Sequence, residues 1–183
     1  MVCYQRVQNL GEMLTKARLP PQRAPRPRRE LSKGFHPCRK PRCPVCEPMQ
    51  DKRTVTSVQC SATGSDFVIS SNITCSSKNV VYCISCTRGG RVCPDHPQYI
   101  GETGQEVKER LRQHRGTIVQ PGQSDTTAPV GVHFRLPGHT VCDLRLVPIE
   151  KIHSKDTLVR KVRETFLINK FSTVSKGLNI KMC

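Results

Sequence analysis

The stretch from Asn79 to Arg115 constrains the fold more than any other part of this 183-residue chain. Two short apolar runs within it, VVYCI from Val80 and QYIG from Gln98, are rich in β-branched and aromatic residues and are bounded by polar or turn-forming residues. Such runs predict β-strands, and the second is a strand if the first pairs with it. A polar segment with helical spacing follows. We therefore expect two paired strands that lead into a helix.

The start of that helix has its own sequence signal. Thr103 and Glu106 have the spacing of a capping box, in which two backbone N–H groups receive side-chain acceptors. Val107 and Leu111 lie one turn apart and define the buried side, while Arg110 stands beside that stripe. The pattern predicts a guanidinium group at the border of the core, on a helix that ends at about residue 115.

Three further elements are expected towards the C-terminus. A short helix over residues 130–135 precedes the alternating pattern of residues 142–152, which predicts a third strand. Pro148 places this strand at a sheet edge, because proline donates no hydrogen bond to a ladder. A long helix is expected over residues 155–171, capped by Ser154. Together these elements predict an α+β fold with a small three-stranded antiparallel sheet flanked by helices.

Charge and cysteine content restrict the class of protein. Thirty basic and fourteen acidic side chains give a net charge of +16, which favours nucleic acid as a partner well before an anionic membrane. No stretch approaches the ~20 apolar residues of a membrane span. Eleven cysteines in a chain whose first residues do not resemble a signal peptide predict metal ligands in a reducing compartment. We therefore expect a nuclear or cytoplasmic protein that is not secreted.

The chain divides into three expected parts. Residues 1–35 contain a short amphipathic helix and then a basic, proline-rich linker, for which a solvated tether is a simpler explanation than a dedicated nuclear-import or RNA-binding arm. Residues 36–75 form a Cys-rich appendage with a hairpin whose arms are residues 54–60 and 66–73. Residues 76–183 form the main domain.

The Cys-rich appendage contains a pattern typical of a zinc knuckle. Cys38, Cys43 and Cys46 have the spacing C-x4-C-x2-C, and tetrahedral zinc needs a fourth nitrogen or sulfur ligand. The candidates for the fourth ligand are His36, Cys60 and Cys75. We favour Cys75, since its bond would attach the appendage to the main domain. The alternative is a cluster of inert thiols.

The order of these motifs resembles the GIY-YIG nuclease module, in the version found at the C-terminal end of Penelope-like and related retroelement reverse transcriptases. The resemblance covers about residues 75–183, with Val80 and Val81 in place of the Gly and Ile of the name. It implies catalytic tyrosines, an arginine on the scissile phosphate, a glutamate that binds Mg²⁺ or Mn²⁺, and nearby supporting polar groups. The residues that match are Tyr82, Tyr99, Arg110, Glu164, His114 and Asn179.

The resemblance also implies a zinc site inside the nuclease core. Its matching ligands are Cys86, Cys93, His133 and His139. Cys83 and His96 remain competitors, because the spacing between the two matched cysteines is longer than usual in the family. The alternative for the two downstream histidines is a pair of ordinary surface residues near a turn.

Glu164 has two interpretations. It precedes Leu167 by three residues and lies on the same expected face, where a buried carboxylate needs a cation such as a metal ion or Arg110. The second interpretation is a solvated side chain beside Arg160 or Arg163, which is the commoner environment of a glutamate on a helix. The family match favours the metal ligand.

The sequence therefore predicts a divalent-metal-dependent DNA endonuclease that nicks by phosphodiester hydrolysis and derives from a retroelement. RNA is equally eligible as a substrate from charge alone. The alternative is a zinc-stabilised nucleic-acid-binding remnant without catalytic activity. A weaker third hypothesis is a protein-interaction role for the proline-rich linker.

Overall fold

The computed structural model describes residues 32–47, 53–88, 93, 97–120 and 128–180. The helix expected in residues 1–19, most of the linker expected in residues 20–35, and His96 lie outside the described residues. Residues 31–183 form one unit. No helix in the described part of the chain is long and apolar enough to cross a membrane. The expected α+β class, with small antiparallel sheets and helices, is confirmed.

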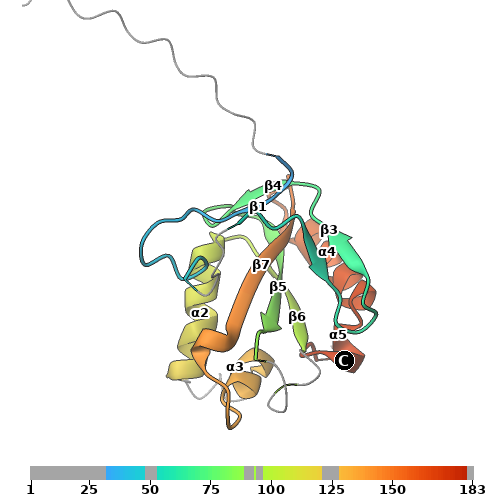
Figure 1. Ribbon diagram of the computed structural model, residues 1–183. Helices are drawn as coiled ribbons and strands as arrows, with labels where there is room; N and C mark the ends of the chain where they lie inside the picture. Colours follow the sequence, from blue (N-terminus) through green and yellow to red (C-terminus); the bar gives the residue numbers. More distant parts are fainter. Residues whose placement is uncertain (1–31, 48–52, 89–92, 94–96, 121–127, 181–183) are drawn as a thin grey trace, which may run out of the picture. The chain divides into compact units, whose positions relative to one another are not determined.

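A three-stranded antiparallel sheet lies at the centre of this unit (Figure 1). Strand β5 (Val80–Cys86) lies between β6 (Gln98–Thr103) and β7 (Leu144–Lys151). Six of the seven residues of β5 are buried, which explains its continuous apolar sequence. Pro148 lies in the edge strand β7, as its missing N–H group predicted, and the ladder shifts register close to it.

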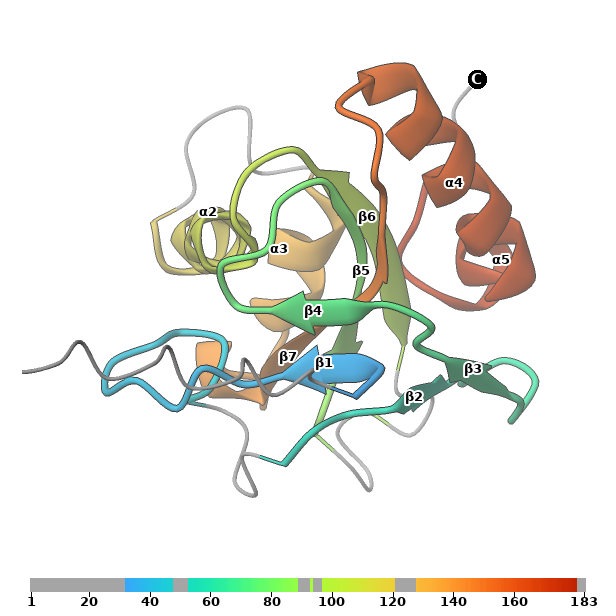
Figure 2. The same cartoon turned by 90° about the horizontal axis from the view of Figure 1, so that it is seen from above.

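Helices cover both sides of this sheet. Figure 2 shows α2 (Val107–Val119) and α3 (Pro129–Phe134) on one side of the sheet, and α4 (Thr157–Lys170) and α5 (Thr173–Lys176) on the other. A short 3₁₀ turn, η2 (Val141–Asp143), leads into β7. Helix α2 faces the core with Val107, Leu111, His114 and Ile118.

The starts of the two long helices differ from expectation. Thr103 ends strand β6 and accepts a hydrogen bond from the Gln105 N–H group, so it is not available as a helix cap. Helix α2 begins at Val107 without a side-chain cap, and the loop before β5 supplies carbonyl acceptors to its first N–H groups instead. Helix α4 is capped by Asp156, whose carboxylate accepts from the Leu158 N–H group at 2.8 Å, whereas Ser154 accepts from Asp156.

Two small sheets pack beside the central one. Strand β1 (Gly34–His36) pairs in parallel with β4 (Asn72–Thr74), and β2 (Ser57–Gln59) forms an antiparallel hairpin with β3 (Asp66–Val68). The linker expected up to residue 35 therefore ends earlier. The second arm of the expected hairpin is split, because residues 72–74 find a partner in β1 and not in β2.

The two apolar stripes of α4 have different environments. Leu167 on this helix and Phe171 just after it are buried against the sheet. Leu158, Val162 and Phe166 form a second stripe that is 67%, 59% and 49% exposed. The chain has few aromatic residues, and four of them are buried in the small core: Phe35, Tyr82, Phe134 and Phe171.

The position of Phe35 yields a stability prediction. Its side chain is 0% exposed and its backbone bonds to Val55, so residues 34–36 belong to the folded unit. We expect Phe35→Ala to lower the free energy of unfolding by about 3–5 kcal/mol, because it leaves a cavity in the core. Chemical denaturation measures this change. Val68→Ala, at a 68% exposed position, is the control and should stay within about 0.5 kcal/mol of wild type; equal values for both variants would contradict burial of Phe35.

Candidate active site and metal centres

The hydroxyl group of Tyr82 is the centre of a buried polar cluster. Tyr82 lies on β5 with 0% exposure, and the Arg110 Nε–H group donates to its Oη at 2.9 Å. The Nε2 atom of His114 lies 2.9 Å from the same oxygen. Arg110 and His114 are one turn apart on α2, so a single helix supplies both partners.

The direction of these hydrogen bonds follows from the charge state of His114. Burial, aided by the positive charge of Arg110, lowers the pKa of His114 to about 3, so its imidazole is neutral at physiological pH. Because Arg110 can only donate, the Tyr82 hydroxyl accepts from it and donates its own proton to His114 Nε2. Nδ1 of His114 then carries the ring proton.

Burial also controls the two phenols. Catalysis by Tyr82 as a base would need cations to lower its pKa, but desolvation outweighs the contact with Arg110 and raises the pKa of Tyr82. The pKa of Tyr99 is raised by burial and by the charge of Glu164. Both phenols are therefore protonated at neutral pH in the protein without ligands.

Gly101 allows the two tyrosines to lie together. In the ladder Tyr82 is opposite Gly101, and Ile84 is opposite Tyr99, so both phenols project from one face of the sheet. A Cβ atom at position 101 would lie 2.5 Å from Tyr82 Oη and 2.8 Å from Tyr99 Cε1. The sequence signal for this role was an isolated glycine in a strand, which often marks close approach of other groups.

Gln113 is a second residue whose role the sequence did not predict. Its side-chain oxygen accepts from Arg110 Nη1 at 3.0 Å, and its amide donates to Gln105 at 2.9 Å. These bonds hold the guanidinium plane of Arg110 in addition to its bond with Tyr82. The available signal was the spacing of three residues between Arg110 and Gln113 on one helix.

Glu164 and Asn179 satisfy the free backbone edge of β6. The Glu102 N–H group donates to Glu164 Oε1 at 3.1 Å. The amide of Asn179 bonds both the N–H and the C=O group of Ile100 at 2.8 Å, and the Leu178 N–H group donates to Gln98. An unpaired strand edge is thereby closed by side chains from α4 and from the segment after α5.

Glu164 has no arginine as an ion-pair partner among the described residues. Arg160 pairs with Glu102 at 2.7 Å, and Arg163 pairs with Glu150 at 3.0 Å. Burial and the charge of Glu102 raise the pKa of Glu164, and the hydrogen bond from the Glu102 N–H group and the positive charges of Arg110 and Lys161 oppose this shift only in part. Glu164 is half-buried and pairs with neither Arg160 nor Arg163, so the alternative of a solvated glutamate beside one of these arginines is not what the structure contains.

Comparison of the chain with protein-family models, with curated proteins and with solved structures found no match. The functional argument therefore depends on the geometry of the site. The six residues that the resemblance implied are placed around one face and one edge of β5 and β6. Electrostatic interactions link Glu164 with Arg110, Tyr82 and Tyr99.

A cluster of four cysteines lies beside the start of α2. The Sγ atoms of Cys38, Cys43, Cys46 and Cys75 all lie within 4.8 Å of one another. The other candidates for the fourth ligand lie elsewhere, since His36 contacts the Ser32 carbonyl and Cys60 contacts the Phe171 carbonyl. Four such thiols could hold a structural metal ion such as zinc.

The thiols of this cluster do not share one electrostatic environment. Burial acts to raise the pKa of Cys38, but hydrogen bonds from the Lys40 N–H group and the neighbouring thiols outweigh it and lower the pKa to about 7. Burial raises the pKa of Cys75. A bound cation would favour the thiolate form of both, so metal binding and thiol deprotonation are coupled.

A second cluster joins the end of β5 to α3. The ligand atoms of Cys86, Cys93, His133 and His139 lie within 4.8 Å of one another. Both ring nitrogens of His139 are buried without a hydrogen-bond partner in the part of the chain that the structure describes, which a metal ion would explain. Cys83, one of the two competitors, is fully buried in the sheet away from this cluster.

The four-cysteine cluster is attached to α2 at two points, in its first turn and at Arg115. The Cys75 carbonyl accepts from the Lys108 N–H group in the first turn. Glu47, which follows Cys46, forms an ion pair with Arg115 at 3.1 Å. A metal ion in this cluster would therefore also fix the helix that carries Arg110.

These two clusters give a prediction for metal content. We expect the purified protein to contain two zinc ions per chain, one in each cluster, measured by elemental analysis. Cys75→Ser should reduce this content to one zinc ion, because it removes a ligand of only one cluster. Cys142→Ser is the matched control at an exposed cysteine and should retain both ions. Retention of two zinc ions without Cys75 would contradict the assignment.

Proposed function

We propose that this protein is a divalent-metal-dependent endonuclease of the GIY-YIG type that hydrolyses phosphodiester bonds of DNA. The observation that carries the proposal is the hydrogen-bonded series of Arg110, Tyr82 and His114, with Glu164 held at the adjoining strand edge. The net charge of +16 supports a nucleic-acid substrate. The preference for DNA comes from the resemblance to retroelement nucleases, and zinc is the proposed occupant of both Cys-containing clusters.

Arg110 is suited to bind the scissile phosphate. Its Nε–H group is used by Tyr82 and one N–H of Nη1 by Gln113, which leaves other N–H groups of the same planar fork for non-bridging phosphate oxygens. The bonds to Tyr82 and Gln113 fix the plane before substrate arrives. The guanidinium can then stabilise the charge that develops at phosphorus without reorganising.

Tyr82 and His114 are suited to orient a water molecule and to accept its proton. The Tyr82 hydroxyl accepts from Arg110 and donates to His114, so one lone pair remains for a water O–H group. Tyr82 is 0% exposed in the protein without substrate, so this step requires that substrate binding admit a water molecule beside the hydroxyl. As the water oxygen bonds to phosphorus and the bond to the leaving oxygen breaks, the water proton passes to Tyr82 Oη. The phenol proton passes to His114 Nε2, and solvent protonates the leaving oxygen.

A Mg²⁺ or Mn²⁺ ion on Glu164 would supply Lewis-acid stabilisation of the phosphate charge. Glu164 can contribute its Oε2 atom to the ion while its Oε1 atom accepts from the Glu102 N–H group. Tyr99 lies edge-on to His114, with ring centroids 5.9 Å apart, and lines the same face. Asn179 holds the strand between Tyr99 and Gly101 in place.

Two substitutions test catalysis separately from binding. We expect Glu164→Gln and Arg110→Ala each to reduce nicking of supercoiled plasmid by at least ~100-fold, because each removes transition-state stabilisation. Gln at position 164 can still accept from Glu102, which preserves the fold. Binding of the plasmid, measured by gel shift, should persist.

Matched controls lie on the exposed face of α2, the helix that carries Arg110. Glu109→Gln and Arg112→Ala alter an exposed ion pair of α2 and should leave nicking within about twofold of wild type. If the unaltered protein binds nucleic acid but never nicks with Mg²⁺ or Mn²⁺, the non-catalytic binding module is the correct reading.

The protonation states give a pH prediction for the nicking rate. Since the pKa of His114 is about 3, no step should appear near its ordinary value of about 6.5. The pKa of Tyr82 is raised, so the phenol stays protonated and His114 stays neutral from about pH 6 to 9, and the rate should stay nearly constant over this range. Single-turnover nicking at saturating Mg²⁺ measures this profile. A rate that rises steeply with pH between about 6 and 9 would show that a different group takes the proton.

A further inference from the structure

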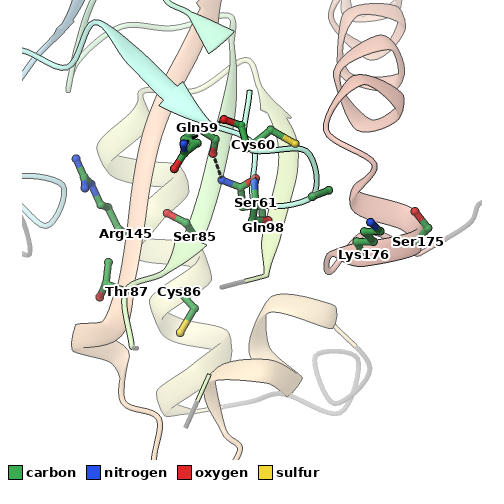
Figure 3. A pocket seen from close by; sticks show the side chains of 12 residues that line it. Gln59, Cys60, Ser61, Ser85, Cys86, Thr87, Gln98, Arg145, Ser175 and Lys176 are labelled. Atoms are coloured by element: carbon green, nitrogen blue, oxygen red, sulfur yellow. Dashed lines mark hydrogen bonds between the residues drawn. The ribbon is translucent and has the colours of Figure 1, made fainter. Parts of the chain in front are cut away.

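A hollow of about 920 Å³ lies on the other face of the central sheet (Figure 3). Ser85, in its floor, is three residues from Tyr82 on β5, and side chains alternate along a strand, so the two point to opposite faces. Arg145, Ser85 and Gln98 form one row across β7, β5 and β6. The β2–β3 hairpin and α5 form the walls. The sheet therefore separates this hollow from the Arg110 side.

The charge of the hollow has one sign. Arg145 comes from β7 and Lys176 from α5, and Figure 3 shows them on opposite sides of the group of labelled residues. No carboxylate occurs among the described residues that line it, and most of the others carry hydroxyl or amide groups. A concave surface with two cations and many neutral hydrogen-bonding groups favours a polar anion.

Arg145 has an unused hydrogen-bond donor in this place. Its Nε atom is buried and has no hydrogen-bond partner among the described residues. A smaller neighbouring hollow of about 210 Å³ shares Arg145, Ser85 and Gln98 with the larger one, so Arg145 lines both spaces. The buried Nε atom is therefore not itself open to a ligand, and it is Arg145 as a cation lining both hollows that can attract an anionic oxygen.

The walls of the hollow are fixed by hydrogen bonds. The Gln98 side chain accepts from the Ser61 N–H group at 3.0 Å and donates to the Gln59 carbonyl at 2.7 Å, which joins the hairpin to β6. The Leu178 N–H group donates to the Gln98 carbonyl and positions the segment after α5. The hollow is thus formed before a ligand binds, which lowers the entropic cost of binding.

We infer that this hollow is a second anion-binding site that takes a nucleotide unit, with its phosphate between Arg145 and Lys176. The size suits a sugar-phosphate with its base. No aromatic residue occurs among the described lining residues, so recognition uses the phosphate and hydrogen bonds and not base stacking. The unit can come from a free nucleotide or from a single strand of nucleic acid. The inference does not depend on the nuclease proposal, because the two sites lie on opposite faces.

Binding measurements with defined probes test this inference. Thymidine monophosphate, inorganic phosphate and a single-stranded oligothymidylate are titrated into the full chain without added Mg²⁺, by calorimetry or fluorescence anisotropy. We expect Arg145→Gln and Lys176→Gln each to weaken binding of a nucleotide-containing probe by about tenfold or more, as loss of a charged hydrogen bond implies. Lys176 is exposed, so its replacement should leave the fold intact.

Arg53→Gln is the matched control, since it removes one exposed cation that does not line the hollow. It should change affinity by less than about twofold at moderate salt. If the affinity for thymidine monophosphate depends on Arg145 and Lys176, the ligand is a free nucleotide. If only the affinity for the oligonucleotide depends on them, the ligand is a single strand. The inference would be overturned if Arg145→Gln, Lys176→Gln and Arg53→Gln all left the affinities unchanged, or if all three lowered them equally. Plasmid nicking by Lys176→Gln reports separately on the nuclease proposal.

Discussion

A phenol hydroxyl that water does not reach must find its hydrogen bonds inside the protein, and that of Tyr82 finds them on α2. This requirement fixes the rotation of α2 about its axis, because only one face carries both Arg110 and His114. It also explains why position 101 has no side chain, since the space beside the hydroxyl is already filled. The packing of the sheet against the helix and the polarity of the candidate active site are therefore consequences of one buried oxygen.

The edge of β6 combines structure and chemistry in a similar way. An edge strand needs partners for its outward N–H and C=O groups, and here Glu164 and Asn179 provide them from distant parts of the sequence. The same contacts place a carboxylate next to the face that carries both tyrosines. A residue with a structural bond on one oxygen can still offer its other oxygen to a cation, so the strand-closing bond of Glu164 is compatible with the metal-binding role proposed for it.

Elements with local signals were predictable from the sequence. The two tyrosine-bearing strands, the edge position of Pro148 and the grouping of Cys38, Cys43 and Cys46 follow from periodicity and spacing within short windows. Features that depend on a distant partner were not predictable in this way. Thr103 has an extended backbone because β6 pairs with β5, so the expected capping box does not form. Residues Gly34–His36 form a strand and not part of the expected linker, because they pair with β4. The pKa of Tyr82 likewise depends on burial, which charge counting along the chain cannot give.

The closure of β6 by Leu178 and Asn179 has a consequence during translation. These residues are translated well after the strand itself, so the nascent β6 has an open edge while the roughly 75 residues between Thr103 and Leu178 are being made, about 4–15 seconds at usual elongation rates. Such an edge invites pairing with another chain. Closure of the β6 edge, and with it the final position of Glu164 and Asn179, is thus completed only after all three strands of the central sheet have been translated.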